Sequence, residues 1–178
     1  MGEVTNVAVF DLPSAYWPVA ESVVRSGRSP EDVPGAVVEH LRALVERCYC
    51  QEAVFAVEHK PYWRSVIYPA YKVGRIEKDP ALREQYERLT VALQLGGACV
   101  VSAAHEERED YSWYEADDVC ASVAKRIVEQ RKLNVVVVSD DHDLAQCLPD
   151  YLDDRYPTLP GDTVQKARVY LARATLAG

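Results

Sequence analysis

The sequence predicts a three-layer α/β/α sandwich with a mainly parallel central sheet. Short apolar segments alternate along the chain with amphipathic segments of helical length, an order typical of parallel sheets covered by helices. The apolar run in 134–139, NVVVVS, suits a parallel strand that is buried on both faces. A chain of 178 residues is long enough for one such domain with a substantial core, so we expect residues 1–178 to form a single domain.

The first half of the chain supplies two strands and a helix. Segment 4–10, VTNVAVF, is an apolar strand that ends at Asp11. Segment 36–48 follows, and its apolar residues recur at the spacing of a helix. Segment 52–57, EAVFAV, is the second strand.

The second half repeats this alternation. Segment 80–93 has helical spacing and is followed by a Gly-Gly pair that ends it. Segment 98–103, ACVVSA, is the third strand. Segment 115–132 is an amphipathic helix with acids at its start, where the helix dipole favours negative charge. After the fourth strand, a final helix is expected at 162–176.

Composition excludes several classes of protein. No run approaches the roughly 18 apolar residues of a membrane span, and the N-terminus lacks a signal-peptide pattern, so we expect a cytoplasmic protein without a membrane partner. The spacing of the five cysteines matches neither a zinc site nor a disulfide framework. A net charge of −8 argues against a simple basic nucleic-acid binder.

The charge is nevertheless unevenly distributed. Segment 60–78 is rich in Lys, Arg, Tyr and Trp and contains the single acid Glu77, whereas 139–154 contains six aspartates and no Lys or Arg.

Acidic side chains follow each predicted strand. Because ligands of parallel sheets bind beyond the carboxyl ends of the strands, six of these carboxylates are expected to converge at one edge: Asp11, Glu58, Glu115, Asp117, Asp141 and Asp143. Their mutual repulsion would be relieved by a divalent cation. Oxygen ligands without a Cys/His set favour Mg²⁺ or Mn²⁺, and two such ions can promote phosphodiester hydrolysis.

Three segments resemble, in order, the motifs of the 5′-to-3′ exonuclease and flap endonuclease family. These are PIN-like nucleases with a resolvase-like fold, which also form the N-terminal exonuclease part of bacterial DNA polymerase I. WRSVIYPAYKVGR (63–75) is similar to the family's F-R-x-x-x-Y-P-x-Y-K-x-x-R segment. EADDVCASVAKR (115–126) resembles its acidic helix, and SDDHDLAQCL (139–148) its T-G/A-D-K-D-L-x-Q-L segment.

The resemblance implies a metal-dependent, structure-specific 5′ nuclease that hydrolyses DNA with activated water and one or two Mg²⁺ or Mn²⁺ ions. The implied metal ligands are Asp11, Glu58, Glu115, Asp117, Asp118, Asp141 and Asp143. Asp11, Lys72 and Arg75 are the implied catalytic residues, and Arg64, Tyr68, Tyr71, Lys72 and Arg75 the implied DNA-binding residues. For Tyr68, packing in the core is the alternative role.

The sequence departs from the family at three places. The first motif reads DLPS rather than D-G-N/S-S, and after the second strand either Val57 or Glu58 occupies the position of a family aspartate. The family's G-D-x-x-D-N-x-P-G-V segment and helix-hairpin-helix have no counterpart, and only Asp162 stands in the corresponding LPGDTVQKARVYL. We therefore expect a minimal nuclease core that acts on DNA 5′ ends or flaps, or that depends on a protein partner for duplex grip; the acidic segment 104–113 is a candidate surface for that partner.

Other functions remain open at this point. A PIN-type ribonuclease shares the sheet and the acids, which leaves RNA as a possible substrate. A catalytically weakened nucleic-acid-binding or assembly subunit is compatible with the missing acids. VFDLPS also resembles the first motif of haloacid-dehalogenase-type phosphatases, but Pro13 stands where that family needs a second acid.

Overall fold

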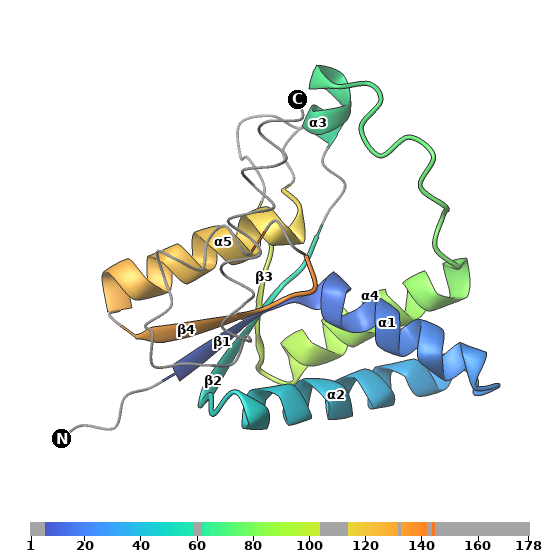
Figure 1. The fold of residues 1–178 in the computed structure, drawn as a ribbon. Helices are drawn as coiled ribbons and strands as arrows, with labels where there is room; N and C mark the ends of the chain where they lie inside the picture. Colours follow the sequence, from blue (N-terminus) through green and yellow to red (C-terminus); the bar gives the residue numbers. More distant parts are fainter. Residues whose placement is uncertain (1–5, 59–61, 104–113, 132, 142–143, 145–178) are drawn as a thin grey trace, which may run out of the picture.

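A computed structural model of the protein describes residues 6–58, 62–103, 114–131, 133–141 and 144 (Figure 1). Within them the order is β1 (Asn6–Asp11), α1 (Leu12–Arg25), η1 (Pro30–Asp32), α2 (Val33–Arg47), β2 (Glu52–Ala56), α3 (Tyr62–Ile67), α4 (Pro80–Leu95), β3 (Cys99–Val101), α5 (Ala116–Arg126), η2 (Ile127–Arg131) and β4 (Asn134–Val138). The predicted α/β fold is confirmed. The helix predicted at 162–176 lies outside the described residues.

The four described strands form one parallel sheet in the order β3-β2-β1-β4. Phe10 of β1 is in register with Phe55 of β2 on one side and with Val138 of β4 on the other. Since all four strands run in the same direction, their carboxyl ends meet at one edge of the sheet. The first of the predicted metal-ligating acids, Asp11, is at this edge.

Helices cover both faces of the sheet, as Figure 1 shows. Alternate residues of β1 point to opposite faces: Ala8 and Phe10 pack with α1, α2 and α4, whereas Val7 and Val9 pack with α5. The Phe10 and Phe55 rings stack with their centroids 5.2 Å apart. Every residue of β1 is buried, which makes this strand the centre of the fold.

Helix α1 was not predicted from the sequence. Pro18 lies inside it and cannot donate a hydrogen bond to the carbonyl of Ser14, so the segment lacks a clean helical signal. Asp11 is its N-cap, and Leu12, Tyr16, Ala20 and Val23 form a buried stripe. The cap and the apolar stripe together outweigh the proline.

The helix predicted at 115–132 is found in two parts. It is α-helical from Ala116 to Arg126 and continues as the π-helical turn η2. A π turn adds a residue to one turn of helix, so it changes the angle at which the chain approaches β4. No helix in the described part of the chain is long and apolar enough to cross a membrane.

Tyr16 joins α1 to α4 through a buried hydrogen bond, and we expect Tyr16→Phe to destabilise the protein. The Tyr16 hydroxyl donates to the carbonyl oxygen of Leu82 at 2.5 Å. Losing one buried hydrogen bond should lower the free energy of unfolding by about 1 kcal/mol. Urea denaturation measures this change. Tyr49→Phe is the control, because Tyr49 is 76 % exposed; equal stability of the two variants would contradict the prediction.

The same hydroxyl gives stability a dependence on alkaline pH. Burial raises the pKa of Tyr16 from 10.0 to about 12. The folded protein therefore holds this proton where the unfolded chain loses it, so the contribution is fully present below pH 10.0 and is lost as pH rises toward about 12. Stability of the Tyr16→Phe variant should decline less steeply over this range.

Candidate functional site

Asp11 stands where β1 ends and α1 begins. Its Oδ1 accepts a hydrogen bond from the backbone N–H of Ser14 at 3.2 Å, which caps α1. Its Oδ2 accepts from the hydroxyl of Ser139 at 2.8 Å. Burial raises the pKa of Asp11, the two hydrogen bonds oppose this, and the charges of Asp141 and Asp140 raise the pKa further. A desolvated carboxylate with acidic neighbours thus ends the central strand.

The loop after β4 brings more acids to the same edge. The backbone N–H of Asp140 donates to Ser14 Oγ at 2.7 Å, and that of Asp141 donates to Ser139 Oγ at 3.0 Å. Both aspartates are exposed, so their carboxylates reach solvent while their backbone is held. The predicted ligand Asp143 lies outside the described residues.

The N-terminus of α5 carries three carboxylates that lie close together and are called the Glu115 cluster below: Glu115, Asp117 and Asp118. Carboxylate oxygens of Glu115, Asp117 and Asp118 lie within 4.8 Å of one another. Glu115 is the N-cap and forms a capping box with Asp118, and the helix dipole favours negative charge here. Oxygen donors at this spacing suit a hard divalent cation such as Mg²⁺ or Mn²⁺.

Two cations from the segment between β2 and α4 contact these carboxylates. Arg64 of α3 pairs with Glu115 and, at 2.5 Å between Nη2 and Oδ2, with Asp118. The ammonium group of Lys72 pairs with Glu115. The Tyr71 hydroxyl donates to Glu115 and accepts from Arg64 Nη1 at 2.8 Å. These contacts tie a segment about 50 positions away in the sequence to the start of α5.

The pKa values in this cluster shift in opposite directions. Burial favours protonation of Glu115, which is only 4 % exposed, but hydrogen bonds from Lys72 and Tyr71 and the charges of Lys72 and Arg64 outweigh it and lower its pKa. Burial raises the pKa of Asp117; a hydrogen bond from the backbone N–H of Asp118 opposes this, and the charges of Asp118 and Glu115 add to it. Two cations against three carboxylates leave the cluster acidic.

The charge of Glu58 interacts with both groups of acids, the one at Asp11 and the one at Glu115. Although its surface reaches solvent, protein atoms crowd its carboxyl group, and this desolvation raises its pKa. Lys72 and Arg75 lower the pKa, whereas Glu115 and Asp11 raise it. Val57, the other residue considered for this position, is buried at 6 % exposure with the sheet and the helices of one face. Of these two residues, Glu58 is therefore the one whose charge interacts with the acids.

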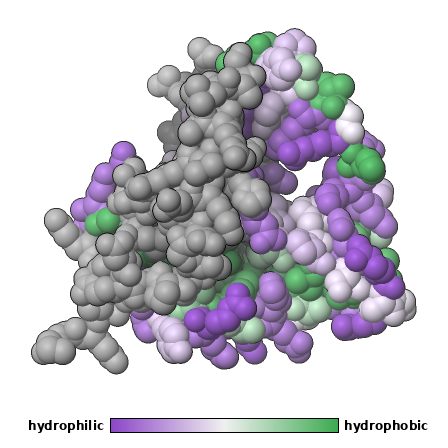
Figure 2. Space-filling model, in the orientation of Figure 1, coloured by the Kyte–Doolittle hydropathy of each residue, from purple (hydrophilic) through white to green (hydrophobic). Residues whose placement is uncertain are grey.

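The rest of the basic segment is open to solvent. Arg75 is exposed, and Tyr68 is 59 % exposed, so Tyr68 does not pack in the core. Four exposed apolar side chains lie between the cations: Val66, Ile67, Val73 and Ile76. The chain from α3 to α4 stands away from the sheet in Figure 1, and Figure 2 shows open space between it and the helices below.

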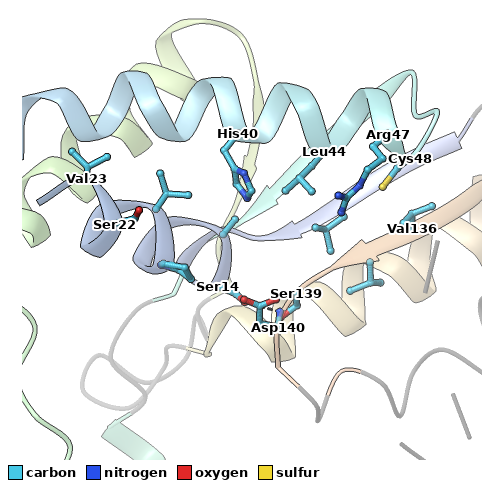
Figure 3. Close-up of a pocket in the computed structure, with 15 residues that line it drawn as sticks. Ser14, Ser22, Val23, His40, Leu44, Arg47, Cys48, Val136, Ser139 and Asp140 are labelled. Atoms are coloured by element: carbon cyan, nitrogen blue, oxygen red, sulfur yellow. Dashed lines mark hydrogen bonds between the residues drawn. The ribbon is translucent and has the colours of Figure 1, made fainter. Parts of the chain in front are cut away.

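A separate groove of about 530 Å³ lies between α1, α2 and β4. Figure 3 shows His40, Leu44, Arg47 and Cys48 on one side of it, and Ser14, Ser139 and Asp140 together at one end. Among the described residues, the groove therefore shares Ser14, Ser139 and Asp140 with the acidic edge.

Three partners of the acids were missed by sequence reasoning. Tyr71 was predicted only to contact DNA, and Ser14 and Ser139 were assigned no role. A signal for the serines exists: Ser14 stands three residues after an N-cap aspartate, and Ser139 directly follows a buried strand. No sequence signal pairs Tyr71 with Glu115.

The chain is similar to a known protein family over most of its length. The family model for the 5′-3′ exonuclease N-terminal resolvase-like domain matches residues 15–170. DNA polymerase I of Chloroflexus aurantiacus is 29 % identical over 140 residues, which is 78 % of this chain and 14 % of that polymerase. The chain therefore corresponds to a small part of that relative.

The fold also matches a solved structure. A crystal structure of the T5 D15 protein, co-crystallized with metal ions, has a TM-score of 0.54 and 20 % sequence identity. The match covers 82 % of this chain and 52 % of the other. At this identity the likeness shows a common fold.

The cluster at α5 predicts how the basic segment responds to loss of one charge. Glu115→Gln removes the carboxylate that contacts Arg64, Tyr71 and Lys72. Without it the segment should be held less firmly, so trypsin should cleave after Lys72 and Arg75 about fivefold faster, as expected when a local opening costs about 1 kcal/mol less. Mass spectrometry of timed digests measures these rates.

The matched control is Glu52→Gln. Glu52 pairs with Arg131 at 3.2 Å on an exposed surface, so its loss removes an ion pair outside the acidic cluster. Equal cleavage of the Glu115→Gln variant and the unmodified protein at these two sites would show that the contacts do not restrain the segment.

Proposed function

The chain belongs to the family of 5′-3′ exonuclease N-terminal resolvase-like domains, and from this premise we propose that it is a Mg²⁺- or Mn²⁺-dependent nuclease acting on DNA 5′ ends or flaps. The observation that carries the proposal is that acids from separate elements come to one edge of the sheet: Asp11, Asp141 and the Glu115 cluster. The charge of Glu58 interacts with both Asp11 and Glu115. We further propose that residues 1–178 form one PIN-like domain.

The donor set fits a divalent metal ion. Glu115, Asp117 and Asp118 offer carboxylate oxygens within 4.8 Å of one another, with neither cysteine nor histidine among them. We propose that these three, with Asp11, Glu58, Asp141 and Asp143, hold one or two ions. A bound ion would lower the pKa of the attacking water and would stabilise the negative charge that develops on the leaving oxygen.

The cations beside the acids suit the binding of phosphate. In the structure Arg64 and Lys72 pair with Glu115, and Arg75 is exposed on the same segment. A DNA phosphate offers the same kind of acceptor oxygens, with which Arg pairs through two N–H groups and Lys as a point charge. We propose that Arg64, Lys72 and Arg75 bind the phosphate to be cleaved, with Lys72 and Arg75 stabilising its developing charge.

Unpaired DNA suits the exposed part of the segment. Tyr68 presents an open ring, and base–aromatic stacking is tolerant of sequence. The apolar side chains beside it would avoid water when covered by bases, and the flanking cations would contact the backbone. A single-stranded 5′ end or flap offers both bases and phosphates to one surface.

Cleavage assays test the function directly. We expect cleavage of a labelled 5′-flap DNA with Mn²⁺ or Mg²⁺ and none with EDTA. Asp141→Ala should lower the rate by about 100-fold or more, because it removes a proposed ligand rather than a group that supports one. Asp140→Ala is the matched control, since its hydrogen bond to Ser14 comes from the backbone and survives the substitution.

Each other outcome excludes a part of the proposal. Cleavage confined to RNA would favour a PIN-type ribonuclease. Binding of DNA without cleavage under any metal would favour an assembly subunit. An unchanged rate for Asp141→Ala would refute the assignment of the site.

The ion pairs also predict how strongly the DNA-free protein binds a metal ion. Lys72 opposes a cation in the cluster, so Lys72→Met should tighten Mn²⁺ binding to the DNA-free protein while slowing cleavage. An interaction on the order of 1 kcal/mol at this partly exposed position corresponds to about fivefold in affinity. Isothermal titration calorimetry at constant ionic strength measures it.

Lys78→Met is the control for this substitution. Lys78 is on the same segment but pairs with Glu21 of α1 at 2.8 Å, outside the acidic cluster. Weaker Mn²⁺ binding in the Lys72→Met variant would mean that Lys72 arranges the carboxylates for the metal rather than competing with it.

A further inference from the structure

Two serines join the end of β1 to the loop that follows β4. Ser14 donates its backbone N–H to Asp11 Oδ1 at 3.2 Å and accepts the N–H of Asp140 on its hydroxyl at 2.7 Å. Ser139 donates its hydroxyl to Asp11 Oδ2 at 2.8 Å and accepts the N–H of Asp141 at 3.0 Å. Each serine therefore contacts both the Asp11 carboxylate and the backbone of the acidic loop.

The strand register explains why Ser139 can do this. Phe10 of β1 is in register with Val138 of β4, so the residues that follow them, Asp11 at the end of β1 and Ser139 just after β4, lie side by side. A serine hydroxyl has one proton to donate. In Ser139 that proton is given to Asp11, and the oxygen receives the N–H of Asp141. The direction of the hydroxyl is fixed by one partner at the end of β1 and one in the loop after β4.

The bonds act on groups that matter for binding a cation. Asp11 is 6 % exposed, and a buried carboxylate resists ionisation unless donors stabilise its charge. The Ser139 hydroxyl is such a donor, and it also sets the rotation of the carboxylate. By accepting the N–H of Asp141, the same hydroxyl also fixes the backbone position of that residue.

We propose that Ser139 is a positioning residue, which holds the carboxylate of Asp11 and the backbone of Asp141 in the arrangement that binds a divalent cation. This inference rests on the proposed function, because it takes Asp11 and Asp141 as metal ligands. Ser139 itself contacts neither substrate nor metal in this role. Ser14 supports the same arrangement from the side of α1.

Mn²⁺ affinity of the full chain, measured by isothermal titration calorimetry without DNA, tests the proposal. Ser139→Ala removes both hydrogen bonds and should weaken binding by about tenfold, the lower end of the range for groups that orient ligands. Ser139→Thr keeps the hydroxyl and should restore affinity to within about twofold, since the same two bonds can form. Ser22→Ala is the matched control, because Ser22 is exposed on α1.

A double variant separates positioning from a general loss of structure. Because one of the two Ser139 hydrogen bonds acts through Asp11, the loss of affinity caused by Ser139→Ala should be smaller in an Asp11→Asn background than in the unmodified protein. Independent, additive losses would overturn the proposal. So would equal weakening by Ser139→Ala and Ser139→Thr, or unchanged affinity in Ser139→Ala. Circular dichroism checks that each variant folds; if Ser139→Ala does not, Ser139→Cys, whose thiol is a weak donor, should weaken binding instead.

The experiment distinguishes this inference from the proposed function. If Asp11→Asn and Asp141→Ala leave Mn²⁺ affinity unchanged, the proposed metal site is wrong. If these variants lose affinity and Ser139→Ala does not, the metal site stands and the role of Ser139 is wrong.

Discussion

The convergence of carboxylates at one edge of the sheet is the constraint on which the rest of the site depends. Parallel strands end at the same edge, so acids that follow them must share that space. Like charges at short range resist ionisation unless counter-charge or hydrogen-bond donors stabilise them. The protein supplies both: cations from the segment between β2 and α4 at the Glu115 cluster, and hydroxyl and backbone donors at Asp11.

The donors that stabilise Asp11 and the cations that stabilise Glu115 differ in how easily another partner can replace them. The donors to Asp11 come from short side chains and backbone at the ends of β4 and α1, where the sheet fixes their positions. Arg64 and Lys72 reach Glu115 through long, flexible side chains on an exposed segment. Exchanging such a side chain for a metal ion or a phosphate partner disturbs no strand pairing. One half of the proposed site is therefore built into the fold, whereas the other half depends on long side chains of an exposed segment.

The same distinction explains what the sequence could predict. The four strands and the place of Asp11, Glu115 and Asp141 after them follow from apolar patterns and the geometry of parallel sheets, so these were within reach. Helix α1 was missed because Pro18 obscures its pattern, although Asp11 caps it. The pairing of Lys72 with Glu115 depends on the path of an irregular segment, in which Lys72 has a φ of 55°. Neither composition nor periodicity encodes such a path.

Asp11 illustrates how one residue serves structure and site together. The DLPS turn leads directly into α1, so the carboxylate at the end of β1 is also the helix cap. Both of its oxygens accept a hydrogen bond from the protein, one from Ser14 and one from Ser139. Each carboxylate oxygen has about two lone-pair sites, so each keeps one for a further partner. Holding Asp11 in place therefore leaves oxygen lone pairs for a further partner, and the departure from the family's glycine-containing turn preserves the acid.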